Sequence, residues 1–467
     1  MKRPSPNLTL AVLSSAGLAY AVLSSAVVPA LPTIQHNLHT SETGVTWLLT
    51  GYLLSASVGT AILGRLGDMY GKEHVLVWTL VMLAAGTLVA ALSHSLALLI
   101  AARVIQGVAG GIFPLAFGIV RDEFPREKVA GSIGFLSAVL GIGAGIGILA
   151  GGLIVEHLSW QWLFWMPLAV IVAAALGTWW FVPESPVRVP GRIKWAAAAL
   201  MSVGMTAVLL AITETTTWGW GSARTLGLLA AGFAVCAVWI AVETRSREPL
   251  IDMAMMRIRG VWTTNLTAFL LGAGMYASFI VFPQFAQLPK STGFGFGASV
   301  VLSGVYLLPS TLGMVVVGFS AGWIARLFGS KPAVIAGSAV TAASFGLITV
   351  AHAHPYEMLI STALLGIGVG LAFAALGNLI VQAVEPHQTG AAGGMNTVMR
   401  TIGGALGGQL SATFIADHMH GRYPTVTGFT DTFAMATGFL IVCTIGAVLI
   451  PHGRATRRRS ALAVAAD

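Results

Sequence analysis

Long apolar runs separated by short polar segments make up almost the whole chain. A helix that crosses a membrane needs about 20 apolar residues, and the sequence contains fourteen runs of this kind. Alternation typical of strands is absent, and lipid does not tolerate unpaired backbone, so the pattern predicts helices throughout. The predicted spans are 8–30, 44–64, 75–95, 97–120, 131–155, 161–182, 193–213, 224–243, 260–286, 298–323, 332–351, 357–380, 391–415 and 432–451.

The composition agrees with an all-α integral membrane protein. Of the 467 residues, 56% are hydrophobic and only 9% are charged, whereas soluble domains carry about 25% charged residues. The net charge of +8 is scattered through short loops and does not gather on one face, which argues against a nucleic-acid partner. Cys236 and Cys443 both lie inside apolar runs, so they predict small packed residues and neither a disulfide nor a metal site.

The positions of Lys and Arg predict the orientation in the membrane. The run that begins at Leu8 is long enough to span and is followed by many similar runs, so we interpret it as the first span and not as a cleaved signal peptide. With the N-terminus in the cytoplasm, 20 of the 25 basic residues fall in inner segments, and only Arg224, Lys290 and Arg422 fall in outer loops. This bias predicts a multi-pass protein of the cell membrane with both termini cytoplasmic.

A polar turn between two spans, GRLGDMYGKEH at residues 64–74, has a weaker copy at residues 322–329. Its glycines recur 258 residues later, and glycines of the fourth and fifth spans recur at offsets of 259 and 261. Spans one to six therefore correspond to spans nine to fourteen, with the same orientation, as in a parallel repeat. The predicted units are a first six-helix bundle (1–183), a linker with two inserted helices (184–259), a second six-helix bundle (260–451) and a basic tail (452–467).

Together these motifs resemble the major facilitator superfamily, in particular its 14-spanner drug:proton antiporter family. The resemblance implies two six-helix bundles, alternating access, a small-molecule substrate, and a proton gradient as energy source with no cofactor; we expect a monomer in the bilayer. Two positions depart from the family pattern, because Ile148 replaces a usual proline and Leu23 an aspartate found in many relatives; both bear on proton coupling. The matching stretches are 28–34, 47–55, 64–74, 99–111, 143–152 and 160–165.

Residues Gly64, Asp68, Gly71 and Lys72 of the polar turn are the predicted conformational gate. Asp68 lies at the inner end of the second span, where a carboxylate can accept hydrogen bonds from a neighbouring helix N-terminus. The repeat places that N-terminus near Gly390. The alternative is a solvated loop carboxylate.

Two arginines fall inside predicted spans, where a charge is costly unless it faces a partner or a cavity. Arg103 is part of the fourth-span motif, and the resemblance makes Arg103, Gln106 and Gly107 candidates for proton coupling. For each arginine, the alternative is a structural side chain bonded to backbone carbonyls. For Arg400, near the midplane, we favour a role in the cavity.

In the fifth span, Gly143, Gly147, Gly151 and Gly152 form the antiporter motif of the family. Their small-xxx-small spacing predicts a face on which another helix packs closely. We interpret it as a packing seam before any direct role in binding.

The substrate cavity is predicted from polar and aromatic residues within spans, since small-molecule sites are mostly apolar with a few polar groups. The candidates are Tyr52, Asn265, Tyr276, Phe373 and Arg400. None of the 17 carboxylates falls at mid-span. The sequence therefore favours neutral, zwitterionic or anionic amphiphiles over organic cations.

No phosphate-binding loop, dinucleotide fingerprint or nucleophile elbow is present, which argues against an ATP-driven pump and an enzyme. We therefore expect a secondary transporter that exports hydrophobic or amphiphilic small molecules. The alternatives are a dedicated exporter of a lipid or endogenous metabolite, proton-linked uptake, and a membrane sensor that does not transport. The outer loops contain paired histidines, but their i, i+2 spacing in a loop is only weak evidence for a metal site.

Overall fold

The computed structural model describes residues 5–185, 194–246, 248–420 and 423–451. The first half of the chain is helical, as the apolar runs predict. Its elements are α1 (Pro6–Ala26), η1 (Val28–Ala30), α2 (Leu31–Asn37), α3 (Glu42–Tyr70), α4 (Lys72–Ala91), α5 (Leu96–Val108), η2 (Ala109–Gly111), α6 (Ile112–Glu123), α7 (Arg126–His157) and α8 (Trp162–Phe181).

In the rest of the described chain the helices are joined by loops, and one short pair of strands is present. Strands β1 (Met419–His420) and β2 (Tyr423–Pro424) pair antiparallel, which corrects the prediction of helices throughout. Two-residue strands are too short to leave an alternating pattern in the sequence. The helices are α9 (Trp195–Thr213), α10 (Thr215–Trp218), α11 (Ala223–Thr244), α12 (Met253–Arg257), α13 (Arg259–Gln287), η3 (Lys290–Thr292), α14 (Val300–Leu327), α15 (Ser330–Val350), α16 (Pro355–Ala383), η4 (Pro386–Gln388), α17 (Thr389–Asp417) and α18 (Val426–Val448).

Among the described residues, 13 helical segments are long and apolar enough to cross a membrane. The predicted span 391–415 lies in α17, a 29-residue helix that is rich in glycine and contains Arg400. The first and fourth predicted spans are not continuous α-helices, because short 3-10 turns interrupt them at Val28–Ala30 and Ala109–Gly111.

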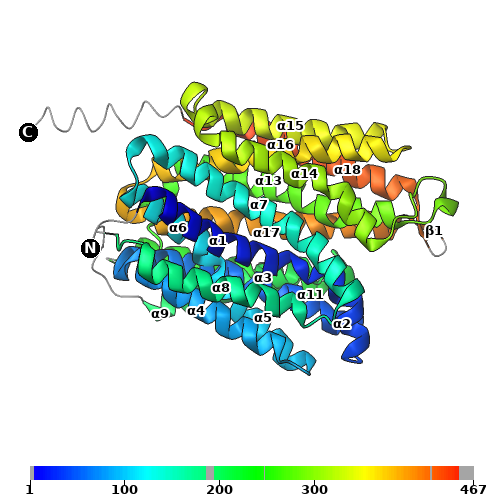
Figure 1. Cartoon of the computed structure of the whole chain (residues 1–467), viewed down its shortest axis with the longest axis horizontal. Helices are drawn as coiled ribbons and strands as arrows, with labels where there is room; N and C mark the ends of the chain where they lie inside the picture. Colours follow the sequence, from blue (N-terminus) through cyan, green and yellow to red (C-terminus); the bar gives the residue numbers. More distant parts are fainter. Residues whose placement is uncertain (1–4, 186–193, 247, 421–422, 452–467) are drawn as a thin grey trace, which may run out of the picture.

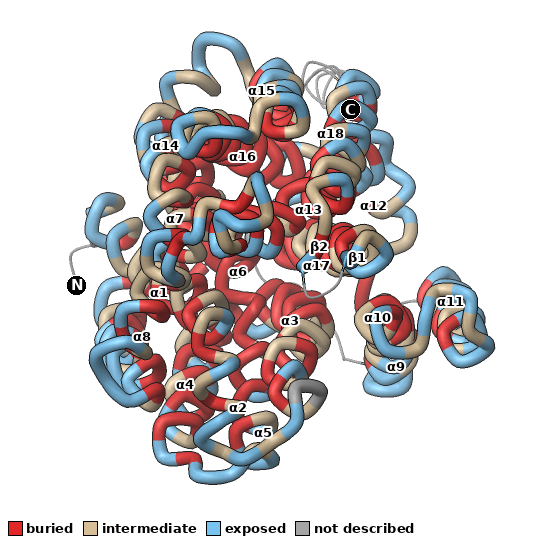
Figure 2. The backbone as a smooth tube through the Cα atoms, turned by 90° about the vertical axis from the view of Figure 1, so that its right-hand side faces the viewer, coloured by how far each residue is buried: buried red, intermediate tan, exposed pale blue. Residues whose placement is uncertain are grey.

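The two halves lie side by side, as Figure 1 and Figure 2 show, with helices α1–α8 in one half and α13–α18 in the other. One hydrophobic core fills the first half and includes residues of α9, α16 and α17, and a second core fills the rest of the second half. The halves meet mainly where α3 packs on α17 and where α7 packs on α14. In the repeat, α3 corresponds to α14 and α7 to α17, so these two contacts are equivalent.

The repeated polar turn has the same backbone in both halves. Gly71 ends α3 with φ 106°, and Gly329 follows α14 with φ 82°. Residues with a Cβ rarely adopt such positive φ values, so glycine is required at both turns. The end of the bundle that contains Asp68 and these two turns is called the Asp68 end below.

Between the halves in sequence, α9 and α11 form a helix pair at the side of the molecule (Figure 2). Helix α9 contacts both α3 and α17, and α11 packs mainly on α9. Cys236 of α11 packs where Gly204 of α9 leaves room, and Cys443 is buried in α18. The division of the chain at residues 183/184 and 259/260 stays a prediction, and the tail 452–467 lies outside the described residues.

Candidate functional site

Asp68 joins the two halves at the Asp68 end. Its side chain is fully buried, and its carboxylate accepts hydrogen bonds from the backbone N–H groups of Gly390 (3.3 Å) and Ala391 (3.2 Å), in the first turn of α17. These amides have no partner within the helix, and the helix dipole makes this terminus positive, so a carboxylate is favoured there. The predicted contact near Gly390 is confirmed.

Lys72 connects Asp68 to a second carboxylate. Its buried ammonium lies 3.5 Å from Asp68 Oδ1 and 2.8 Å from Asp122 Oδ2. Asp122 also accepts a hydrogen bond from the Ser185 hydroxyl. A buried ammonium is tolerated only when it is paired and hydrogen-bonded, so Lys72 and the two aspartates form one network. The sequence analysis missed Asp122, because its partners are 50 or more residues away.

Arg121, next to Asp122, forms a second bridge between the halves. Its guanidinium donates to the carbonyls of Val384 (2.8 Å) and Glu385 (3.2 Å) and to the Thr389 hydroxyl (2.5 Å). The carbonyls at a helix C-terminus have no partner within the helix, so a cation there is favourable. The end of α16 and the start of α17 are thus both held by charged residues of the first half.

Close glycine contacts also join the two halves at the Asp68 end. Gly64 of α3 packs directly on the backbone of Gly390, and the equivalent Gly322 of α14 packs on Gly131 of α7, where an added Cβ would lie 2.9 Å from the Gly131 Cα. Only the first contact includes a carboxylate, because Asp68 corresponds to Arg326, which is exposed. The halves therefore share a shape at this end but not a charge.

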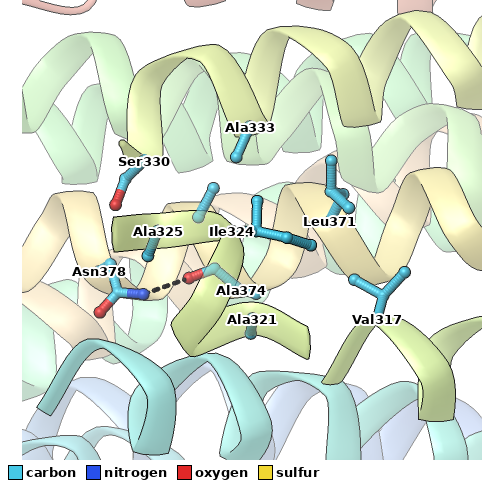
Figure 3. Close-up of a pocket in the computed structure, with 10 residues that line it drawn as sticks. Val317, Ala321, Ile324, Ala325, Ser330, Ala333, Leu371, Ala374 and Asn378 are labelled. Carbon is cyan, nitrogen blue, oxygen red and sulfur yellow. Dashed lines mark hydrogen bonds between the residues drawn. The ribbon is translucent and has the colours of Figure 1, made fainter. Parts of the chain in front are cut away.

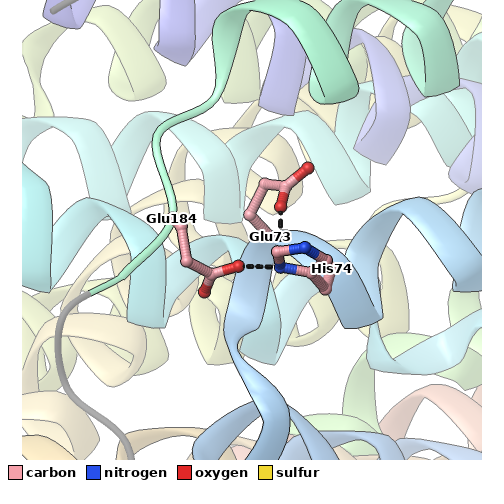
Figure 4. Close-up of side chains that lie close together, drawn as sticks. All are labelled: Glu73, His74 and Glu184. Carbon is pink, nitrogen blue, oxygen red and sulfur yellow. Dashed lines mark hydrogen bonds and ion pairs between the residues drawn. The ribbon is translucent and has the colours of Figure 1, made fainter.

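Three further side chains meet beside these contacts (Figure 4). His74 bonds to Glu184 and lies 3.1 Å from Glu73. Glu184 also packs against Gly71. The ligand atoms of this trio are close enough to hold a metal ion, but its present geometry is that of a histidine that links two carboxylates. The contact between His74 and Glu184 joins the polar turn to the segment after α8. The sequence did not predict this contact, because the two residues are far apart in the chain.

Arg103 is fully buried within the first half. Its guanidinium donates to the carbonyls of Leu48 (3.1 Å) and Leu23 (3.3 Å) and to Gln106 Oε1 (2.9 Å). The carbon of the guanidinium lies 4.1 Å from the ring centroid of Tyr52, while Nη2 has no hydrogen-bond partner among the described residues. These contacts join three helices, which is the structural alternative considered for this residue.

Gln106 and Gly107 support this arrangement. The Gln106 amide donates to the Thr87 hydroxyl of α4 (3.3 Å). Gly107 rests on the backbone of Tyr52, where any Cβ would collide. Helix α5 therefore lies close enough to α3 for Arg103 to reach both the Tyr52 ring and the Leu48 carbonyl.

The glycines of the antiporter motif face α1. Added Cβ atoms at Gly143, Gly147 and Gly151 would collide with Ala21, Val22 and Ala26, respectively, and Gly152 is buried. The predicted packing face is confirmed, and it lies inside the first half.

Replacing Gly147 with leucine is expected to lower folded yield and apparent melting temperature, because the α1 backbone leaves no room for the side chain. Fluorescence-detected size-exclusion chromatography after heating measures both. The matched control is Gly438→Leu, since Gly438 is an exposed helical glycine with nothing within 4 Å of an added Cβ. Equal stability of the two variants would contradict the close α1–α7 packing.

A cavity lies between the halves, midway along the helices. It offers about 10 Å³, enough for about one water molecule. Phe373 and Arg400, both predicted for the substrate cavity, line it, and the Arg400 guanidinium carbon lies 4.7 Å from the Phe373 ring centroid. The sequence analysis missed Phe117 and Ser137, which resemble ordinary packed residues in a span. The lining is Phe113, Phe117, Ser137, Leu140, Phe373, Gly377, Ile380, Gly393, Asn396, Thr397 and Arg400.

The other three candidates lie outside this lining. Asn265 is buried and accepts a hydrogen bond from Asn396 (3.0 Å). Tyr276 packs on Gly404. Tyr52 lies beneath Arg103 and stacks on Tyr20, with 5.9 Å between ring centroids. Tyr20, absent from the predicted site, also packs against Phe113 of the cavity lining, with 6.3 Å between ring centroids.

A second small cavity lies within the second half, among α14, α15 and α16 (Figure 3). Small and apolar side chains line it, with Asn378 at its edge. The Asn378 amide donates to the Ala374 carbonyl (3.0 Å) and to Ala130 of the first half (2.9 Å). The cavity offers about 10 Å³ and, unlike the cavity between the halves, is lined by helices of one half only, so we interpret it as a packing gap.

Comparison with known proteins agrees with this geometry. Residues 13–408 match the family model of the Major Facilitator Superfamily. The tetracenomycin C resistance and export protein of Streptomyces glaucescens is 32% identical, over 90% of this chain and 78% of its own. The puromycin resistance protein pur8 of Streptomyces alboniger is 28% identical, over 95% and 91%. Multidrug resistance protein 3 of Bacillus subtilis is 26% identical, over 77% and 70%.

A solved structure has the same fold. The human organic anion transporter MFSD10 aligns with a TM-score of 0.70 at 16% identity, over 95% of this chain and 100% of its own. The match covers both helical halves of the described structure. With the family model extending over most of the chain, the protein belongs to the Major Facilitator Superfamily and is a multi-pass membrane transporter of small molecules.

Proposed function

We propose that this transporter exports hydrophobic or amphiphilic small molecules in exchange for protons, acting as a monomer. The relatives named for resistance to tetracenomycin C, puromycin and multiple drugs support export of this substrate class. The cavity between the halves supports it as well, because aromatic rings and a single charged side chain line it.

The orientation that we propose places the Asp68 end in the cytoplasm. Most described basic residues lie at this end, as the positive-inside rule requires, whereas Arg224 and Lys290 lie at the opposite end. In this orientation the cytoplasmic gate is closed. The described basic residues at the Asp68 end are Arg65, Lys72, Arg121, Arg126, Lys128, Lys194, Arg245, Arg257, Arg259, Arg326 and Lys331.

The observation that carries the mechanism is the contact of Asp68 with the first turn of α17. It crosses between the halves at one end of the molecule, while the cavity lies deeper between the same halves. Breaking this contact would let α3 and α17 separate and open the cavity to the cytoplasm. Because a protonated carboxyl group is a weaker acceptor than a carboxylate, proton arrival at Asp68 would favour opening.

Proton exchange is tested in everted membrane vesicles that contain the transporter. Addition of a transported compound to vesicles with a preset acidic interior is expected to release protons, seen as a partial collapse of the pH gradient by a quenched acridine dye. Vesicles without the transporter are the control. Compound uptake with no change in the pH gradient would contradict proton coupling while leaving export intact.

A further inference from the structure

The two intramembrane arginines differ in how fully the protein satisfies them. Arg103 makes three hydrogen bonds to its own half and contacts an aromatic ring. Arg400 of α17 stacks on Phe373, but its guanidinium makes no hydrogen bond or ion pair with any residue that the structure describes. Arg103 therefore has the contacts of a structural side chain, whereas Arg400 is available to a ligand.

Stacking alone does not compensate for the position of Arg400. A cation–π contact contributes less than the free energy that it costs to place an arginine at the centre of a spanning helix. Part of the cost thus remains when the cavity is empty. A bound anion would offset it, because a guanidinium and a carboxylate or sulfonate form strong, charge-assisted hydrogen bonds.

The remaining polar groups of the cavity are already engaged. The Ser137 hydroxyl donates to the Ile133 carbonyl, and the Thr397 hydroxyl donates to the Gly393 carbonyl. The Asn396 amide donates to Asn265. Of the polar side chains that line the cavity, Arg400 is the one without a hydrogen-bond partner in the described part of the chain.

The charge that lines the cavity would repel a cationic ligand. The side chains that line the cavity include Arg400 and no Asp or Glu. An organic cation would therefore meet a positive charge with no carboxylate beside it in the lining, whereas an anion would find that charge favourable.

The walls suit an aromatic or apolar body. Phe113 and Phe117 come from α6 of the first half, and Phe373 comes from α16 of the second. A ligand that pairs with Arg400 would thus contact both halves. Since the closed cavity offers only about 10 Å³, such a ligand enters only when the halves move apart.

From these contacts we propose that the cavity selects amphiphilic organic anions, in which a carboxylate or sulfonate pairs with Arg400 and an aromatic body packs among Phe113, Phe117 and Phe373. This proposal rests on the proposed function, since the anion is the transported substrate.

Two probes with one aromatic framework test it: anilinonaphthalene sulfonate and its uncharged parent N-phenylnaphthylamine. Their dissociation constants are measured on the full-length protein in nanodiscs, for wild type, Arg400→Gln and Arg400→Lys, with ethidium as the cation. Wild type is expected to bind the sulfonate at least about tenfold more tightly than the parent, a difference of about 1.4 kcal/mol. Arg400→Gln should lose this preference with little change for the parent, and Arg400→Lys should keep part of it.

Equal binding of both probes by wild type, or an unchanged preference in Arg400→Gln, overturns the proposal; so does tightest binding of ethidium. Unchanged binding of the uncharged parent by Arg400→Gln shows that its loss of sulfonate binding does not come from misfolding, and the Lys variant shows how much of the preference depends on charge alone. Vesicle uptake of the same probes tests the proposed function separately. Uptake without charge preference leaves export standing and rejects the anion site, whereas selective binding without uptake supports the site and rejects export of these compounds.

Discussion

Replacing Asp68 with asparagine is expected to lower transport by about tenfold or more while the protein stays folded in the membrane. Asparagine can accept one of the two amide hydrogen bonds from α17, but it removes the charge that the helix dipole favours, a contribution of about 0.3–2 kcal/mol. It also leaves the buried ammonium of Lys72 with Asp122 alone. The closed state at the Asp68 end therefore loses stability, and we expect the rate of transport to fall as a result. Initial uptake rates in everted vesicles, normalised to protein level, measure the effect.

The matched control for this variant is Glu127→Gln. Glu127 lies in the first turn of α7, at the same end of the molecule, and its side chain is exposed. Glu127→Gln also replaces a carboxylate with an amide, but it leaves the contact between α3 and α17 unchanged. Wild-type transport by Asp68→Asn, or an equal loss in both variants, would remove the basis for a gate at Asp68.

Arg103→Lys is expected to abolish transport even though it keeps the positive charge. One planar guanidinium reaches Leu48, Leu23 and Gln106 from a single position over the Tyr52 ring. A lysine ammonium is a compact point charge and cannot reproduce this fork. The Leu23 carbonyl in the last turn of α1 and the buried Gln106 amide oxygen would lose their donor, at a cost of about 1–3 kcal/mol each, and the contacts among α1, α3 and α5 would loosen.

For this variant, uptake is measured together with the melting temperature. We expect both to fall, because the contacts of Arg103 are structural. Arg224→Lys is the control, since Arg224 is an exposed residue at the start of α11. Lost transport with an unchanged melting temperature would instead point to a direct role of Arg103 in moving protons, the alternative that the family resemblance raised.

Features that depend on local pattern or on the repeat could be predicted from the sequence. The helices follow from apolar runs of spanning length, because the backbone must be satisfied internally in lipid. The partner of Asp68 follows from the repeat, which carries the start of α7 onto the start of α17 at a nearly constant offset. The small-xxx-small face of the fifth span was visible for the same reason, as a spacing within one helix.

Features that depend on contacts between segments far apart in the sequence could not be predicted. Arg121 contacts residues 263 to 268 positions away, and nothing in its surroundings indicates which helix end it caps. Phe117 and Ser137 line the cavity only because of how α6 and α7 are rotated. Asn265 and Tyr52 were plausible polar or aromatic candidates, but packing within one half determines their contacts. The 3-10 turn at Ala109–Gly111 is likewise hidden within a continuous apolar run.

The central claim is that the halves separate at the Asp68 end when the Asp68 contact is broken, and close at the opposite end. Double electron–electron resonance tests it after the two native cysteines are replaced. One label pair spans the Asp68 end (Tyr70→Cys with Gln382→Cys), and another spans the opposite end (Leu158→Cys with Tyr356→Cys); all four positions are exposed. Introducing Asp68→Asn should shift the first pair to longer distances and the second to shorter ones. Unchanged distances at both ends, or lengthening at both, would contradict the account.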